Sequence, residues 1–272
     1  MVEEIVCQFV KNTREKDHGI GGKKLWHMLR REPNVGCIIG RDKFYDILDA
    51  NDLKIRRKLR RPKTTDSTHG LRVFPNLIKS MVADRPNQIW VSDITYITLY
   101  DPSDPEKYRF CYLSLVLDSY SEEIIGWSLG SGLDREHPLA ALQMALGRIG
   151  RNHAELIHHS DRGSQYASYD YVRMLQSNGI KVSMTETGNP KDNPQAERIN
   201  NTIKNELLKG CVFYDIEEVR AALHTAISFY NNERPHMSIN MLTPVQASEM
   251  AGKLKKKWHS YRDDAIERMA SL

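Results

Sequence analysis

The amino-acid sequence predicts an α/β protein in which a mixed five-stranded sheet is flanked by helices and preceded by a small helical segment. Three consecutive runs of β-branched and aromatic residues are followed by alternating helical and strand-like segments, which is typical of a layered α/β domain. The charge is uneven, because residues 1–80 carry 18 Lys and Arg against 10 Asp and Glu, whereas residues 81–272 carry 21 against 25. With 272 residues, 40% of them hydrophobic, the chain has room for one or two domains with a substantial core.

Composition excludes several classes of protein. No stretch approaches the ~18 apolar residues of a membrane span, and the first residues are acidic where a secretion signal needs basic ones. The four cysteines are scattered without a C-x-x-C pair, so we expect buried thiols in a reducing cytoplasm rather than disulfides or structural zinc. The basic front of the chain indicates a polyanionic partner.

The first 53 residues predict short helices separated by glycine-rich breaks. Apolar residues fall at helical spacing around Leu25 and again around Ile47, on either side of a turn at Pro33–Gly36. Two short amphipathic helices around a turn match the helix-turn-helix layout of DNA-binding segments, although any small helical hairpin has the same pattern. We therefore expect residues 1–53 to form a helix-turn-helix-like DNA-binding segment.

Residues 54–85 predict a basic linker. Blocks of like charge repel and stay extended until a polyanion neutralises them, so a solvated linker and a linker that holds phosphates are compatible interpretations. The candidate phosphate contacts are seven basic residues within ten positions: Lys54, Arg56, Arg57, Lys58, Arg60, Arg61 and Lys63.

The five strands and four helices of the main domain, expected over residues 86–250, follow from local pattern. β-branched and aromatic runs predict strands at 88–100, 110–121, 122–130, 155–161 and 181–185. Apolar residues at helical spacing, with Pro near the start and Gly at the end of several segments, predict helices at 137–150, 168–179, 193–210 and 216–233. Residues 251–272 are expected to be a basic tail.

Three carboxylates in this domain are candidates for chemistry. Asp93 lies inside an otherwise apolar strand, where it is either outward-facing or costly to bury without a partner. Asp161 ends a strand, where sites of open α/β sheets form, although it could also cap the following turn. Glu197 lies in the first turn of a helix, which also suits a surface residue.

Together these carboxylates form an all-oxygen set suited to hard divalent cations such as Mg²⁺. Two such ions can activate an attacking oxygen and stabilise the leaving oxygen in a displacement at phosphorus. On the predicted helix, Glu197, Asn201 and Lys204 share one face, so Lys204 could present a cation to a nearby phosphate. A surface lysine is the alternative.

Several segments of the sequence resemble those of a known family. The segments WVSDITYI, HHSDRGSQY and GNPKDNPQAERINNTIKNEL resemble the three catalytic blocks of the retroviral-integrase-like DDE transposases. The 35 residues between Asp161 and Glu197 and the basic Lys204 also match that pattern. The runs DSYSEEIIGWSL and YNNERPHMSINMLTPVQA resemble the OrfB product of the insertion-sequence-three family of bacterial elements.

The resemblance implies an RNase H-like fold and strand cleavage followed by 3′-hydroxyl strand transfer at the inverted-repeat ends of an insertion sequence. It assigns Asp93, Asp161 and Glu197 as catalytic ligands of two Mg²⁺ ions, with Mn²⁺ as a substitute, and Lys204 as a further catalytic residue. Its implied partners are double-stranded DNA, further copies of the chain and the product of an upstream reading frame. One departure is Glu122, where relatives often carry Arg.

Several residues near the carboxylates keep alternative interpretations. Gln165 and Tyr166 follow Asp161 and are candidate DNA contacts, as is Lys204. Asp118 is a rival carboxylate, for which a turn-capping role is favoured. A non-catalytic DNA-binding regulator and an RNase H-like nuclease remain as alternative functions.

Overall fold

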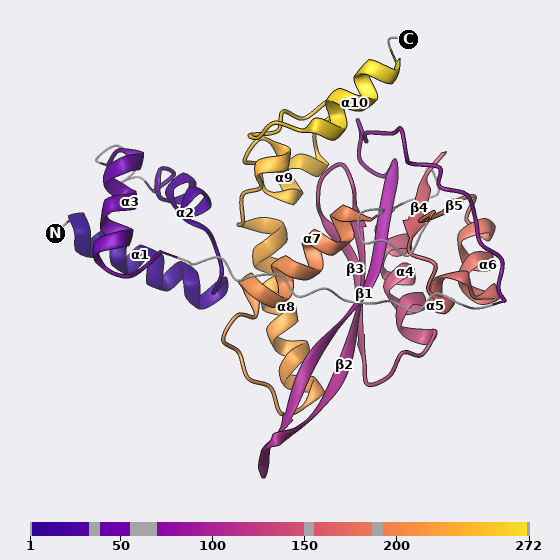
Figure 1. The fold of residues 1–272 in the computed structure, drawn as a ribbon, viewed down its shortest axis with the longest axis horizontal. Helices are drawn as coiled ribbons and strands as arrows, with labels where there is room; N and C mark the ends of the chain where they lie inside the picture. The colour runs from indigo at the N-terminus through magenta and orange to yellow at the C-terminus, as the bar shows by residue number, and fades with distance from the viewer. Residues whose placement is uncertain (1, 33–38, 55–69, 150–154, 187–192, 271–272) are drawn as a thin grey trace.

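The computed structural model describes residues 2–32, 39–54, 70–149, 155–186 and 193–270 of the chain. Its centre is a five-stranded sheet with the order β3-β2-β1-β4-β5 (Figure 1). The strands β1 (Ile89–Asp101), β2 (Asp104–Asp118) and β3 (Ile124–Gly130) are antiparallel neighbours. The strands β4 (Ile157–Ser160) and β5 (Lys181–Met184) continue the sheet in parallel with β1. The predicted mixed sheet is therefore confirmed.

Helices cover both faces of this sheet. One face packs against α4 (Glu136–Arg148), α5 (Ser164–Ala167) and α6 (Tyr169–Ser177), and the other packs against α7 (Pro194–Thr202) and α8 (Ile216–Asn232). Successive side chains of a strand point to opposite faces. Because both faces of the sheet are covered by helices, side chains on both sides of the central strands are buried. Most residues of these strands are therefore apolar.

The helix that carries Glu197 is not regular throughout. The sequence predicts one helix over residues 193–210, but the α-helix ends at Thr202 and a π-helical turn, η2 (Ile203–Leu207), follows. The Leu208 N–H donates to the Ile203 carbonyl, which is five residues earlier, at 2.9 Å. The predicted apolar stripe of this helix is buried as expected: Ala196, Ile199, Ile203 and Leu207.

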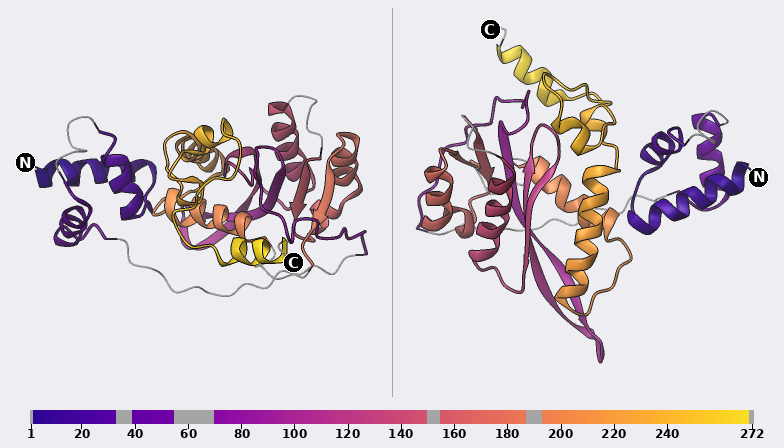
Figure 2. Two further views of the ribbon diagram at one scale, coloured as in Figure 1. Left: turned by 90° about the horizontal axis from the view of Figure 1, so that it is seen from above. Right: turned by 180° about the vertical axis from the view of Figure 1, so that it is seen from behind.

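The amino-terminal segment consists of α1 (Val2–Lys16), α2 (Gly22–Leu29) and α3 (Arg41–Ala50), and it lies beside the end of α8 (Figures 1 and 2). Short helices lie around Leu25 and Ile47, where the sequence predicts them, and α1 is a further helix ahead of them. The predicted turn at Pro33–Gly36 lies outside the described residues.

The linker and the tail are only partly described. Of the predicted phosphate contacts, Lys54 pairs with Asp49 at 3.0 Å, and Arg56, Arg57, Lys58, Arg60, Arg61 and Lys63 lie outside the described residues. The carboxyl-terminal region contains η3 (Met237–Ile239), α9 (Pro244–Ser248) and α10 (Tyr261–Ala270). Among the described residues, every helix is too short or too polar to span a membrane.

Candidate active site

Asp93 and Asp161 meet because their strands are parallel neighbours. β1 and β4 are paired with Val91 opposite His159, so the chain reaches Asp93 and Asp161 two residues further along each strand. Both aspartates thus lie at the carboxyl edge of β4, where sites of open α/β sheets form. The Asp161 Oδ1 atom accepts the Gly163 N–H at 2.8 Å, which fixes the start of the following loop.

Asp93 is held in an electrostatically unfavourable place. Burial above all, together with the negative charges of Asp161 and, to a smaller extent, Glu197, raises the pKa of its carboxyl to about 7. The side-chain amide of Asn200 donates to Asp93 Oδ2 at 2.7 Å and partly opposes this shift of the pKa. A carboxyl with this pKa exchanges a proton near neutral pH, and a cation would stabilise its charged form.

Glu197 lies near this pair but is more exposed. It is in the first turn of α7, and its N–H donates to the Asn193 carbonyl at 3.2 Å. Among the described residues, no three His, Cys, Asp or Glu side chains gather closely enough to form a metal-binding group. The structure therefore brings Asp93 and Asp161 together, with Glu197 close enough for its charge to affect the Asp93 pKa.

The donors around Asp93 suit a hard divalent cation. Two carboxylates from neighbouring strands repel each other, and the buried Asn200 Oδ1 atom has no hydrogen-bond partner among the described residues. Carboxylate and amide oxygens are the ligands that Mg²⁺ and Mn²⁺ accept. Asp93 and Asp161, with Glu197 nearby, thus fit a divalent metal ion.

A buried histidine supports β1 and β4 from within the sheet. The His158 Nε2 atom lies 2.7 Å from Ser92 Oγ and 2.9 Å from Tyr171 Oη, and the side chain is fully buried. Burial lowers the pKa of His158 to about 3, so its ring is neutral at neutral pH. Sequence reasoning missed this residue, although two consecutive histidines in an apolar strand were a visible signal.

The start of α7 is joined directly to β1. Asn193 directly precedes the first residue of this helix, but its side chain does not cap the helix. Its Nδ2 atom instead donates to the Ser92 carbonyl at 3.1 Å. This contact and the bond between Asn200 and Asp93 fix the helix that carries Glu197 onto the strand that carries Asp93.

Lys204 lies in the π-helical turn and contacts β1. Its Nζ atom is 4.9 Å from the centre of the Tyr96 ring, a cation–π distance. The π-helical turn changes the helical spacing on which the predicted common face of Glu197, Asn201 and Lys204 depended. Asn201 accepts a bond from Asn205 at 2.6 Å.

The loop after Asp161 corrects one prediction. Tyr166 is only 2% exposed and packs on Tyr171, with 5.2 Å between ring centres, so it is a core residue and not an available DNA contact. Gln165 is half-buried, and its side chain donates to the Leu133 carbonyl at 3.2 Å. Gln165 also lines an open cavity of about 450 Å³, together with Leu133 and Tyr169, so it keeps access to solvent.

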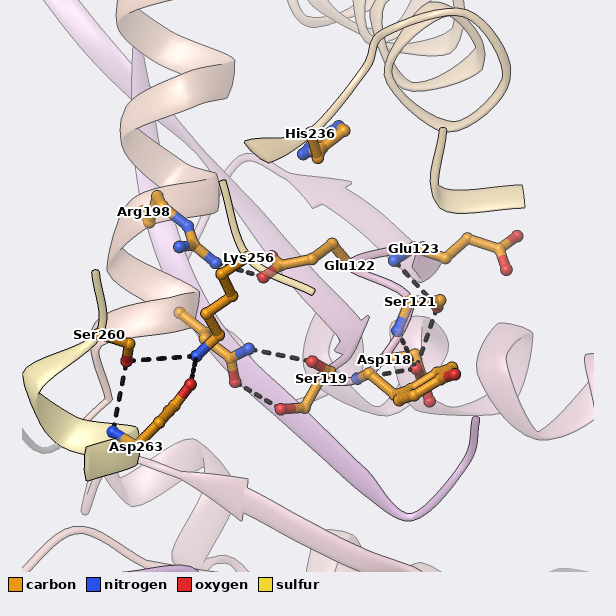
Figure 3. Close-up of polar contacts among 12 residues, drawn as sticks. Asp118, Ser119, Ser121, Glu122, Glu123, Arg198, His236, Lys256, Ser260 and Asp263 are labelled. Carbon is orange, nitrogen blue, oxygen red and sulfur yellow. Dashed lines mark hydrogen bonds and ion pairs between the residues drawn. The ribbon is translucent and has the colours of Figure 1, made fainter. Parts of the chain in front are cut away.

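Asp118 has the turn-capping role that the sequence favoured (Figure 3). Its carboxylate accepts the backbone N–H groups of Asn87, Tyr120 and Ser121 at 2.6, 3.1 and 2.8 Å. Burial raises the pKa of Asp118 to about 6 against the opposing effect of these bonds. With three backbone N–H groups bonded to it, this carboxylate stabilises the turn between β2 and β3.

The unusual Glu122 lies in the same turn and is also paired. It has a positive φ of 60° and forms an ion pair with Arg198, the residue after Glu197 on α7 (Figure 3). The negative charge of Glu122 raises the pKa of Arg198. The departure at Glu122 therefore ties the turn to the helix that carries Glu197.

Comparisons with known proteins agree with this geometry. An integrase core domain model matches residues 83–190, and a second model with the same description matches residues 178–244. A 31 kDa protein of insertion element IS600 from Shigella sonnei is 37% identical over 216 residues, covering 79% of this chain and 76% of that protein. The transposase InsF of insertion sequence IS3A from Escherichia coli is 36% identical over 180 residues, covering 65% and 60%.

A solved structure is similar in fold. It is the intasome of simian T-cell lymphotropic virus in complex with the PP2A regulatory subunit B56 gamma. The TM-score is 0.50 at 16% sequence identity, and the match covers 89% of this chain and 75% of that chain.

Proposed function

Because the chain belongs to the insertion-sequence-three family of DNA transposases with an integrase-like, RNase H-like core, we propose that Asp93, Asp161 and Glu197 form its catalytic centre. The enzyme is a polynucleotidyl transferase. We propose its catalytic residues and the DNA that it cleaves and joins. The supporting observation is that Asp93 lies beside Asp161 where β1 pairs with β4, with Glu197 near enough for its charge to raise the pKa of Asp93.

We propose that Asp93, Asp161 and Glu197 hold two Mg²⁺ ions, for which Mn²⁺ can substitute. When bound, these ions would polarise the attacking and leaving oxygens of a phosphodiester. Asp93 must release its proton to bind a cation, and the bond from Asn200 keeps its carboxylate oriented. Glu197, which is exposed in the first turn of α7, would be the third ligand.

The proposed reaction has two steps at the same centre. Water attacks the phosphodiester at an inverted-repeat end of the element, and the bond to the 3′ oxygen breaks to release a 3′-hydroxyl group. That hydroxyl then attacks a phosphodiester of target DNA and displaces another 3′ oxygen, which joins the two DNAs. Lys204, next to β1, would hold a phosphate of the DNA near the reacting bond.

The remaining DNA contacts and partners are proposed from the sequence. The basic residues of 54–63, beginning with Lys54, would hold the phosphates of double-stranded DNA, and residues 1–53 would recognise the terminal repeat. Gln165, beside the open cavity, would contact DNA near Asp161. We further propose that copies of the chain assemble on DNA in the cytoplasm, at the nucleoid, with the product of an upstream reading frame as a partner.

A strand-transfer assay tests this function. The substrate is a labelled duplex with the terminal repeat of the element, incubated with the full chain, target DNA and Mg²⁺. We expect labelled DNA joined to the target. Preferential cutting of an RNA–DNA hybrid would instead indicate a ribonuclease, and binding without cutting would indicate a regulator.

A further inference from the structure

The loop between α1 and α2 contacts the end of the helix that carries Glu197 and Lys204. The Gly19 N–H donates to the Glu206 carbonyl at 2.6 Å, and the His18 Nδ1 atom lies 3.1 Å from the Leu207 carbonyl. The last carbonyls of a helix have no partners inside the helix. The amino-terminal segment therefore caps the π-helical turn η2 from outside.

Buried charges hold this contact in place. The Arg234 guanidinium, at the end of α8, is 2% exposed, and its Nε atom is 3.0 Å from Asp17 Oδ2. The same guanidinium forms an ion pair with Glu206 of η2, which also lies 3.5 Å from Lys24 of α2. Asp17 is fully buried. The buried Arg234 side chain thus joins the amino-terminal loop, through Asp17, to the helix that carries Glu197, through Glu206.

The approach of the two backbones leaves no room for a side chain at Gly19. A β-carbon at this position would lie 2.6 Å from Glu206 Cβ and 2.7 Å from the Asn205 carbonyl oxygen. Gly21 and Gly40 are in the same amino-terminal segment, and a β-carbon at either would meet nothing within 4 Å. Gly19 is thus required by this contact, and Gly21 provides a matched control.

We propose that the amino-terminal segment is a positioning element for the catalytic helix, acting through Asp17, His18 and Gly19 on η2. A π-helical turn has a wider hydrogen-bond pattern than an α-helix, is rare, and occurs mostly as a single turn within an α-helix. Its carbonyls are bonded here by the segment that we expect to bind the terminal repeat. Through this contact, the amino-terminal segment would set the positions of Lys204 and Glu197. This inference rests on the proposed function, in which both residues are catalytic.

The variant Gly19→Ala in the full chain tests this proposal, with Gly21→Ala as its control. A displacement of about 1 Å at a catalytic group can cost on the order of 100-fold in rate. We expect Gly19→Ala to lower the kcat of strand transfer by on the order of 100-fold, with an unchanged KM for terminal-repeat DNA. Hydrogen exchange should show faster exchange over Ile203–Leu208 and unchanged exchange in β1 and β2. Gly21→Ala should match the wild type in both measurements.

A milder variant keeps the proposal testable if Gly19→Ala does not fold. His18→Ala removes one bond to η2, and Glu233→Gln removes an exposed ion pair to Lys16 across the same interface. We expect faster exchange over Ile203–Leu208 and a lower kcat for His18→Ala only. Wild-type kcat in a His18→Ala or Gly19→Ala variant that has lost this protection would overturn the positioning role. A wild-type chain that transfers no strand would instead overturn the proposed function, while hydrogen exchange would still test the contact.

Discussion

The substitution Asp93→Asn should make the metal-free protein more stable at neutral pH while removing its activity. Asp93 is half-buried beside Asp161 and near Glu197, so its charged form is unfavourable in the folded protein. Asparagine has nearly the same shape, stays neutral and can still accept the bond from Asn200 through its carbonyl oxygen. The substitution therefore removes a charge without creating a cavity.

The magnitude follows from the pKa of Asp93. Its folded-state pKa is about 7, against an ordinary value of 3.8. A group with a raised pKa contributes its full stability below the unfolded pKa, and this contribution is lost as the pH rises through the folded pKa. A pKa difference of about three units corresponds to ~4 kcal/mol of unfolding free energy. Because the Asp93 side chain is partly exposed, we expect the wild type to lose roughly 2–4 kcal/mol of this free energy between pH 4 and pH 7.

Denaturant unfolding of the wild type and of Asp93→Asn in EDTA, from pH 4.5 to pH 8, measures this effect. We expect the difference in unfolding free energy to grow in favour of Asp93→Asn as the pH rises and to level off above about pH 7. Added Mg²⁺ should stabilise only the wild type, because a ligand stabilises the state that binds it. A difference that does not vary with pH would refute the assignment of a strained carboxylate at Asp93.

Three further predictions concern other residues. Glu197→Gln should abolish strand transfer and leave the affinity for terminal-repeat DNA unchanged in a gel-shift assay; detectable joining in Mg²⁺ would contradict its role as a ligand. Lys204→Ala should slow strand transfer by about 10²-fold, the usual effect of losing one donor to a developing charge, whereas Lys204→Arg should keep most of the rate. Asp118→Ala should lower the unfolding free energy by about 1–3 kcal/mol, because the backbone N–H groups of Asn87 and Ser121 lose their acceptor; the rate per folded molecule should not change.

Much of the core was predictable because its signals are local. Residues 89–92 of β1 and 113–118 of β2 are buried on both faces, and most of them are therefore apolar. Asp93 stands out in such a run because an isolated buried carboxylate is costly. The pairing of β1 with β4 then brings Asp161 to the same edge, which the order of the elements already suggested.

The remaining features depend on contacts between segments that are distant in the sequence. Nothing in the residues of η2 predicts a π-helical turn, because no Gly or Pro interrupts them and the bond from Gly19 comes from the other end of the chain. Tyr166 follows a polar loop sequence, yet it is buried by packing against Tyr171. Burial of this kind is set by tertiary packing and has no local signature.

Metal-dependent strand transfer by Asp93 and Asp161 is the central prediction for this protein. The measurement is the yield of joined DNA from a precut terminal-repeat duplex, for the wild type and Asp161→Asn, each in Mg²⁺ and in EDTA. We predict joined product only for the wild type in Mg²⁺, with equal binding of the duplex by both proteins. Joining by Asp161→Asn at the wild-type rate, or joining by the wild type in EDTA, would contradict the assignment of this site.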